Sequence, residues 1–461
     1  MRPRCNPVRP VVRERCRWLS AILAGWILSG FGFGEGTPAD TADPPKALSM
    51  RERADSARTY QIDIRLNVSG KLQAAIGEGK AASLDLKVDG RFRYRERLLD
   101  GAGPGPESLR SVRHYEHAQA DVIVNQRKTT SRLRAAHRLV VAHGRHEGIL
   151  LYCVNDHFSP DEVMLLQVPA DSLAVTSLLP EKNVAVGETW SPPEWLLATL
   201  TGIEAVKKTQ LVCRLQQIER DVATIAFEGK IEGAIYGALS TISVVGIAEF
   251  DTSHRYLRRV RLTQKEKRMI GSVAPGMDVT AEVVLTRAPA SSAPPLDDAN
   301  VRRIPLDPPA EALWLRERFF GDVVCTFDRQ WHVFHRTADA AVLRLVDNGT
   351  LLSQCNLSPV PRMPAGQHTP KTKFVADIQA SLGDKLKEIV TDAEIPTRDG
   401  RYVYRVAVTG QANKLDMQWI YYLCAAPNGR QVSLVFAVET KHLKRFGDRD
   451  RQFVERLRFV R

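Results

Sequence analysis

A two-residue alternation of apolar and polar positions recurs along the first two thirds of the chain. In "YQIDIRLNVSG", the apolar residues Ile62, Ile64, Leu66 and Val68 occupy every second position. This period is typical of a strand with one buried face. Similar alternation predicts strands at 205–218, 222–235, 239–251, 255–270 and 277–287. We therefore expect the first half to be an antiparallel β-rich domain, a curved sheet or partial barrel.

Turn-forming pairs between alternating runs predict hairpins. Asp89-Gly90 separates two such runs, and Asp347-Asn348-Gly349 and Pro427-Asn428-Gly429 do so in the last third of the chain. These are the residue pairs that two-residue hairpin turns favour, since the turns need positive φ angles.

Helix signals are fewer. Ser159 followed by Pro160 predicts a helix over 159–168, and Thr369-Pro370 predicts another, whose apolar stripe recurs every four residues. A last helix is expected at about 446–458. The order of strands, helix, three antiparallel strands and helix predicts an α+β fold for the last third. The apolar stripe of the helix predicted after Thr369-Pro370 consists of Phe374, Ile378, Leu382 and Leu386.

The composition along the 461 residues divides the chain into segments. Six arginines precede a short apolar run at 18–33, which predicts a secretory signal and therefore a periplasmic or extracellular location. An uncleaved signal anchor that tethers the protein to the membrane is the alternative, although the run is short for a span of about 20 residues. We expect a signal peptide at 1–34, a flexible leader at 35–55, a β-rich domain at 56–287, a Pro-rich linker at 288–310 and an α+β domain at 311–461.

Two resemblances extend this picture. The strands "GRYVYRV" and "MQWIYYLCAAPNGRQVSLVFAVE", with the element order above, resemble the PsbP-like fold, which implies an α/β sandwich and a binding or assembly role without catalysis. The stretch "LLPEKNVAVGETW" is similar to a corner found in β-rich domains of exported bacterial proteins of unknown function. We interpret this stretch as structural, with both valines facing the same way. Its residues are Leu179, Pro180, Val184, Val186, Gly187 and Trp190.

Motifs for catalysis, nucleotide binding and metal binding were sought, and none was found, so we expect no catalytic residues, no metal and no cofactor. The pairs His114/His117 and His143/His146 are three residues apart, and such positions point to opposite faces of a strand. Five cysteines follow the signal, without a C-x-x-C pair. Buried thiols and one or two disulfides both remain open for them.

Of the net charge of +12, residues 1–34 hold +5 and the rest of the chain +7, which is moderately basic. The run "RYLRRVRLTQKEKR" is the most basic, and five of its charges share one parity: Arg255, Arg259, Arg261, Lys265 and Lys267. They are our candidate ligand-binding residues, for an anionic polymer or a membrane surface; a solvated sheet face is the alternative. No aromatic ladder is interleaved, so we expect no nucleic acid.

These observations favour an exported, non-catalytic binding or assembly protein of the cell envelope, whose partner is an unknown protein or envelope polymer. Two alternatives belong to other classes. One is a hydrolase whose site is assembled between the two domains. The other is a carrier that holds an apolar ligand inside the N-terminal curved sheet.

Overall fold

The computed structural model describes residues 47–52, 59–77, 80–101 and 105–460. The predicted signal peptide at 1–34 and most of the predicted leader at 35–55 therefore lie outside the described residues. Among the described residues, no helix is both long and apolar enough to cross a membrane.

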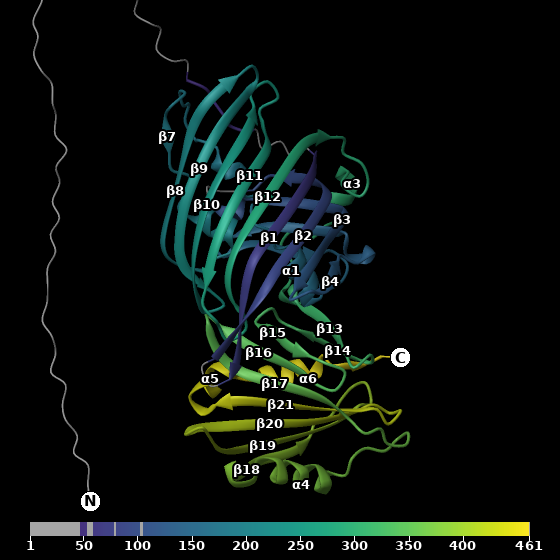
Figure 1. Cartoon of the computed structure of the whole chain (residues 1–461). Coiled ribbons are helices and arrows are strands. Elements are labelled where there is room, and N and C mark those ends of the chain that lie inside the picture. The colour runs from purple at the N-terminus through teal and green to yellow at the C-terminus, as the bar shows by residue number, and fades with distance from the viewer. Residues whose placement is uncertain (1–46, 53–58, 78–79, 102–104, 461) are drawn as a thin grey trace, which may run out of the picture. The chain divides into compact units, whose positions relative to one another are not determined.

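A 12-stranded antiparallel sheet makes up the first part of the described chain (Figure 1). Its order is β6-β5-β3-β2-β1-β12-β11-β10-β9-β8-β7, and β4 pairs with β3 beside this path. The strands are β1 (Thr59–Gly77), β2 (Lys80–Leu99), β3 (Arg110–Val124), β4 (Arg127–Arg132), β5 (Leu139–Arg145), β6 (Gly148–Cys153), β7 (Thr189–Trp190), β8 (Ala205–Glu219), β9 (Val222–Ile235), β10 (Ala238–Asp251), β11 (Tyr256–Arg268) and β12 (Gly276–Ala290).

The predicted strands of this sheet agree with the structure, but the predicted turn at Asp89-Gly90 is wrong. Strand β2 runs straight through both residues, and Gly90 pairs with Leu66 on one side and Ala120 on the other. A Cβ atom at Gly90 would lie 3.1 Å from the Phe92 ring and 3.3 Å from Leu66 Cβ. This glycine therefore leaves space for its neighbours inside a strand and does not form a turn.

One face of the large sheet packs on helices from the middle of the chain, and we call it the inner face; the opposite one is the outer face. Helix α1 (Pro160–Leu166) begins with a complete capping box between Ser159 and Glu162, as the sequence predicts for its start. Figure 1 shows α1 behind β1 and β2. Helix α2 (Glu194–Thr201) ends at Gly202, where φ is 73°. Its leucines share one apolar core with Ile62.

The stretch 178–190 connects these helices to the edge of the sheet. Trp190 Nε1 donates to the carbonyl of Leu178, 2.9 Å away, and Gly187 has a φ of 94°. Val184 is fully buried, whereas Val186 is 48% exposed, so the prediction that the two valines face the same way is wrong. The Glu188 carboxylate accepts from the Ala185 amide at 2.8 Å and tightens the turn.

The last third contains two more antiparallel sheets. One has the order β13-β14-β22 and the other β15-β16-β17-β21-β20-β19-β18. The strands are β13 (Leu315–Phe319), β14 (Val323–Phe327), β15 (Trp331–Arg336), β16 (Ala341–Asp347), β17 (Thr350–Val360), β18 (Leu386–Glu394), β19 (Tyr402–Ala412), β20 (Leu415–Ala425), β21 (Gln431–Glu439) and β22 (Arg458–Phe459). The helices of the last third are α4 (Lys371–Leu382), α5 (Leu443–Phe446) and α6 (Arg449–Glu455).

The two predicted turns of this region join strands as expected. Asn348 and Gly349 have φ angles of 44° and 71° between β16 and β17, the left-handed pair that a tight hairpin needs. In the second turn only Gly429, with a φ of 82°, is left-handed. Helix α4 starts after Pro370, and its residues Phe374 and Ile378 pack on the seven-stranded sheet.

The predicted α+β fold with a PsbP-like α/β sandwich is wrong. Strands account for 55% of the chain and helical elements for 16%, and large antiparallel sheets extend over the whole described region. The helix signals at α1 and α4 were correct locally, but these helices are only 7 and 12 residues long. Fold class depends on how much of the core is formed by sheets. A helix start signal predicts where a helix begins, but it does not predict the share of the core that the sheets form.

The Pro-rich region 288–310 packs on the large sheet. Strand β12 extends to Ala290, and α3 (Asp298–Val301) follows. Leu296 and Ile304 are buried against Val112 and Tyr152. Whether residues 311–461 fold independently of the rest stays a prediction.

Candidate functional site

The basic strand β11 displays most of the predicted ligand-binding residues on the outer face. They alternate with Val260 and Leu262, which are buried on the inner face. Arg255 lies in the turn before the strand, with a φ of 55°. The outer-face members are Arg259, Arg261, Lys265 and Lys267.

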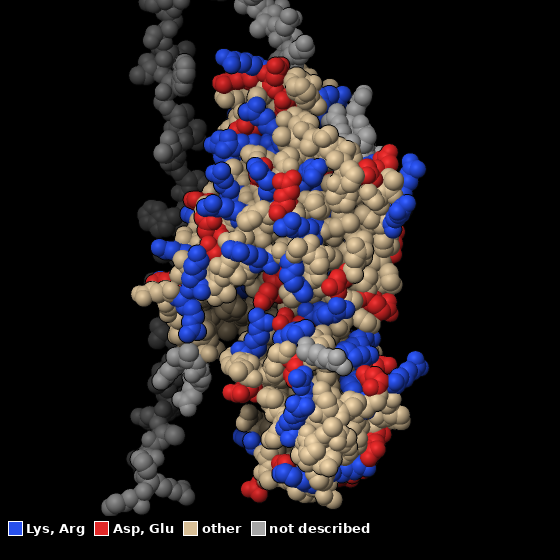
Figure 2. Space-filling view, turned by 90° about the vertical axis from the view of Figure 1, so that its right-hand side faces the viewer, with Lys and Arg blue, Asp and Glu red and all other residues tan. Residues whose placement is uncertain are grey.

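Carboxylates on neighbouring strands offset part of this positive charge. Glu249 on β10 lies 3.0 Å from Arg258 and 3.7 Å from Arg261, and Lys267 lies 3.8 Å from Asp278 on β12. Such exposed pairs contribute about 0–1 kcal/mol each. On the face that Figure 2 shows, Lys and Arg side chains likewise lie among Asp and Glu side chains. The five predicted residues therefore do not form an isolated basic patch.

The register of the strands arranges outer-face charges in rows that cross the sheet. Residues that pair directly across adjacent strands share a row, and three neighbouring rows in the middle of this face alternate in sign, whereas the rows through Arg259 and Lys267 contain both signs. The row through Arg261 is basic, the row through Thr263 is acidic and the row through Lys265 is basic again. The charged members of these rows are Arg214, Arg261, Arg65, Arg91 and Arg132; Glu228, Glu282, Asp89 and Asp121; and Lys230, Lys265, Lys87 and Lys128.

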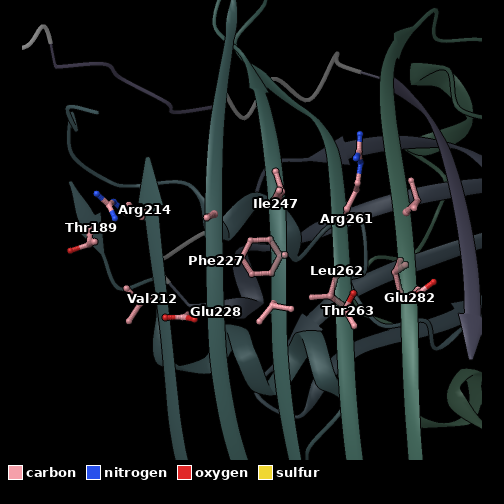
Figure 3. A pocket seen from close by; sticks show the side chains of 15 residues that line it. Thr189, Val212, Arg214, Phe227, Glu228, Ile247, Arg261, Leu262, Thr263 and Glu282 are labelled. Atoms are coloured by element: carbon pink, nitrogen blue, oxygen red, sulfur yellow. The ribbon is translucent and has the colours of Figure 1, made fainter. Parts of the chain in front are cut away.

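A groove of about 800 Å³ lies on the outer face where the first two rows cross β8 to β12. Its apolar floor is centred on β10, where Val245 is 55% exposed and Ile247 is 41% exposed. Figure 3 shows Arg214 and Arg261 at one level of the strands, and Glu228 at the next. The other lining side chains on this face are Thr189, Val212, Ala226, Thr263, Glu282 and Val284.

The strand pair beneath the groove is held by a close contact on the inner face. Gly246 pairs with Phe227, and the Phe227 ring lies where a side chain at position 246 would be. A Cβ atom there would lie 2.2 Å from Phe227 Cζ and 2.5 Å from the carbonyl oxygen of Arg261. The glycine thus permits the packing that positions Val245 and Ile247 on the opposite face.

A second hollow, of about 680 Å³, adjoins the groove at Glu282 and continues over β1, β2 and β3. Most of its lining residues are polar, and they include Asn67, Asp89, Arg91 and Asp121. The outer face thus changes from an apolar floor at β10 to a charged surface at β2.

A cluster of ionisable groups lies elsewhere, around a histidine that is 1% exposed. His137 Nδ1 lies 2.9 Å from Glu162 Oε2, and His137 Nε2 lies 3.1 Å from Asp156 Oδ2. Glu162 also accepts from Arg134, at 2.9 Å to Nε, and Asp156 from Arg316 on β13, at 2.6 Å.

This cluster lacks a free group for proton transfer. Burial alone would raise the pKa of Glu162, but hydrogen bonds from Arg134 and from the Ser159 amide outweigh that effect and lower the pKa to about 2. Burial acts on the pKa of Asp156 in the same way and is likewise outweighed, here by bonds from the His157 amide and His137. Both ring nitrogens of His137 are in hydrogen-bond contact with these carboxylates, and the ring is 1% exposed, so neither nitrogen faces open space.

The predicted histidine pairs do not converge. His143 is 2% exposed on β5, His114 is half-buried on β3, and their partners His117 and His146 are exposed. Within the described ranges, no three His, Cys, Asp or Glu side chains come together as a metal site. All five cysteines are buried free thiols, and burial raises the pKa of Cys213 to about 12.

Sequence reasoning found Arg261 but missed the other groove residues. Arg214, Glu228 and Glu282 each occupy a polar position in an alternating strand, which indicates an outward direction. No local signal indicates that they share neighbouring rows with Arg261, because their strands are paired through register and not through sequence proximity.

No family model and no curated protein matches the chain. Among solved structures, it is similar to lipovitellin, from a study of lipid–protein interactions, with 10% identity over 52% of this chain and a TM-score of 0.29. The chain spans about a quarter of that protein, 26% of its length. It is also similar to OmpF from Salmonella typhi, with 7% identity, coverage of 83% and 98% of the two chains and a TM-score of 0.12. At these TM-scores, neither similarity supports a fold or a function for this chain.

Proposed function

We propose that the chain is an exported, non-catalytic binding protein of the cell envelope and that its outer groove binds an amphipathic ligand with both charges in its polar part. One observation carries this proposal. Exposed apolar side chains lie within both charged rows: Ile247 lies between Arg214 and Arg261 in the arginine row, and Val245 lies between Glu228 and Glu282 in the carboxylate row. Exposed apolar side chains are unremarkable singly, but adjacent ones rimmed by polar groups are typical of binding sites.

The row spacing favours a zwitterionic head. Residues two positions apart along a strand are separated by about 7 Å, at about 3.4 Å per residue. Arg261 and Glu282 thus lie in rows this far apart, on neighbouring strands. A purely anionic polymer would meet the arginine row and also the repulsion of Glu228 and Glu282. The basic strand considered alone favours such a polymer. The experiment below therefore compares binding of an anionic polymer with binding of a zwitterionic lipid.

The contacts of His137 leave this residue unsuited to act as the base of the hydrolase alternative. A general base must lie within hydrogen-bond reach of the proton that it takes. The ring of His137 is 1% exposed, and both of its nitrogens already contact carboxylates.

The test is calorimetric titration of the chain with lysophosphatidylethanolamine below its micelle concentration, compared with lysophosphatidylglycerol of the same acyl length and with alginate. We expect the zwitterionic lipid to bind tightest. Val245→Asp should weaken that binding at least tenfold, about 1.4 kcal/mol, because the alkyl chain would then contact a charged group.

Thr241→Asp is the matched control, since Thr241 lies on the same strand and the same exposed face but outside the groove. It should bind as the parent does. Equal binding of the zwitterionic lipid by the parent and by Val245→Asp, or tighter binding of alginate than of either lipid, would contradict the proposal.

A further inference from the structure

The outer face of the large sheet carries its arginine row and its carboxylate row side by side. The arginine row passes through Arg261 and the carboxylate row through Thr263, both on β11. The line between the two rows crosses β11 at Leu262 and β12 at Val283, which are the middle residues of these strands. A second copy of the chain, turned about this line, would therefore overlap with the full length of both strands.

A half-turn about this line exchanges the two rows. Each strand then faces the same strand of the second copy, and the arginine row of either copy lies over the carboxylate row of the other. Contacts of this kind are reciprocal, as in the two-fold interfaces that most homodimers use. Two sheets that pack face to face lie about 10 Å apart, with their strands within about 30° of each other.

Apolar side chains meet at the centre of this contact. Val245 belongs to the carboxylate row and Ile247 to the arginine row, and both lie on β10. Val245 is 55% exposed and Ile247 is 41% exposed in the single chain. The half-turn places Val245 of each copy opposite Ile247 of the other. Contact removes both side chains from water, which favours association.

Opposite charges meet on both sides of the apolar centre. Arg261 on β11 comes within one strand of Glu282 on β12 of the second copy. On the other side, Arg214 on β8 comes within one strand of Glu228 on β9 of the second copy. Figure 3 labels these four side chains around the groove. Adjacent strands are about 4.8 Å apart, a distance that long charged side chains bridge. The face is thus electrostatically complementary to itself.

These charged groups are available for contacts with a second copy. Within the described chain, Glu228, Glu282 and Arg214 make no ion pair. Arg261 lies 3.7 Å from Glu249, which is a long ion pair on an exposed surface. Exposed pairs contribute little to stability, so its replacement by a contact between copies is not opposed.

A second line on the same face also pairs opposite charges, but it lacks the apolar contact. This line lies between the carboxylate row and the row of Lys265. A half-turn about it places Val245 opposite Ser243 and not opposite Ile247. The contact of two exposed aliphatic side chains therefore favours the line through Leu262.

The outer face is wide enough for a stable interface. Eight adjacent strands, in the order β3-β2-β1-β12-β11-β10-β9-β8, span about 34 Å across the rows, at about 4.8 Å per strand. A contact of this width needs only about seven residues of each strand to bury the roughly 800 Å² per partner of a standard interface. Each of β8 to β12 has at least 13 residues.

We propose that the outer face is the interface of a homodimer, in which the arginine row of each copy lies on the carboxylate row of the other. The two copies cover each other's outer groove, so a second copy and the ligand of the proposed function exclude one another at this face. The dimer goes beyond the proposed function, because it follows from the strand register and from the charges of the rows.

The test is the mass of the full chain in solution, measured by analytical ultracentrifugation without lipid, so that the result does not depend on the proposed function. The parent should be a dimer. Arg261→Glu and Glu282→Arg should each weaken the association at least tenfold, because each variant places like charges together twice. An equal mixture of these two variants should dimerise again, because the mixed pair has opposite charges in both contacts.

Lys265→Glu is the matched control, since Lys265 lies on the same strand and the same face but opposite Arg259 of the second copy. It should associate at least as tightly as the parent. If either charge variant has a lower melting temperature than the parent, Arg214→Glu and Glu228→Arg replace the pair. A monomeric parent, or a mixture of folded variants that stays monomeric, would overturn the proposal. Loss of the dimer in Lys265→Glu would also overturn it, in favour of the other line.

Discussion

His137 illustrates how single contacts determine chemistry at the residue scale. Its ring lies between two carboxylates and against the edge of Phe158, with ring centroids 5.7 Å apart. Through Asp156 it also contacts Arg316, which belongs to another sheet. A histidine held in this way connects two carboxylates inside the protein and presents no open nitrogen to a substrate. A histidine in an open cleft, by contrast, would have a nitrogen available to a substrate.

Acid should therefore destabilise the protein through Glu162. Its pKa is about 2 when folded and 4.5 ordinarily, so its stabilising contribution is present above about pH 4.5 and is lost as the pH falls toward 2. The loss should be about 3 kcal/mol at most, because its partner Arg134 is half exposed. Urea denaturation at pH 7, 4 and 3 measures it. Glu162→Gln should be less stable at pH 7 and less sensitive to acid, and exposed Glu181→Gln should match the parent. An identical acid response in parent and Glu162→Gln would refute this role.

At the element scale, small residues inside strands decide how neighbouring strands pack. Gly90 and Gly246 both lie in strand interiors, where glycine is otherwise unfavourable. Each is next to a phenylalanine ring on the inner face, Phe92 or Phe227. The Asp89-Gly90 pair, which predicts a turn from the sequence, therefore allows close packing within a continuous strand.

Gly246→Ala should destabilise the protein by about 1–3 kcal/mol, the range for overpacking a core. The added methyl group would collide with Phe227 Cζ and with the carbonyl oxygen of Arg261. Chemical denaturation of the two single variants and of the double variant with Phe227→Leu measures the coupling. The double variant should recover part of the loss. Strictly additive effects would show that the ring contact is not responsible.

At the scale of the whole described chain, one apolar core and several polar contacts connect the sheets. The core that contains Ile225 of the large sheet also contains Leu343 of the seven-stranded sheet. Arg329 donates to the carbonyl of Leu151 at 2.6 Å, and Arg336 contacts Asp161 at 3.0 Å. Through these contacts, residues of the first part of the chain stabilise the last third.

A fragment of residues 311–461 should still unfold cooperatively, because it contains its own sheets, one whole apolar cluster and part of the larger one. It should melt at a lower temperature than the full chain, since it loses the contacts of Arg316, Arg329 and Arg336 with residues 151–161. Thermal denaturation followed by circular dichroism measures both. The absence of a cooperative transition would show that the predicted boundary at 288–310 does not separate independent domains.

Local sequence patterns were sufficient to predict those elements that depend on interactions between residues close together in the chain. Alternation predicted β8 to β12 within a few residues, the Ser159 cap predicted the start of α1, and Asn348-Gly349 predicted its hairpin. In each case the necessary information lies within about ten residues: side-chain period, capping geometry or a left-handed φ. The outward direction of Arg261 also followed from alternation alone.

Only the tertiary structure decided which of these elements are neighbours, and the candidate sites depend on that. Strand β1 pairs with β12, more than 200 residues later, and this pairing places Arg65 in the row of Arg261. A slip of one residue in the register would move each side chain to the other face. Alternation along one strand is enough to predict which face a residue occupies. Its partners on other strands depend on the register, and the register is set by burial across the entire sheet.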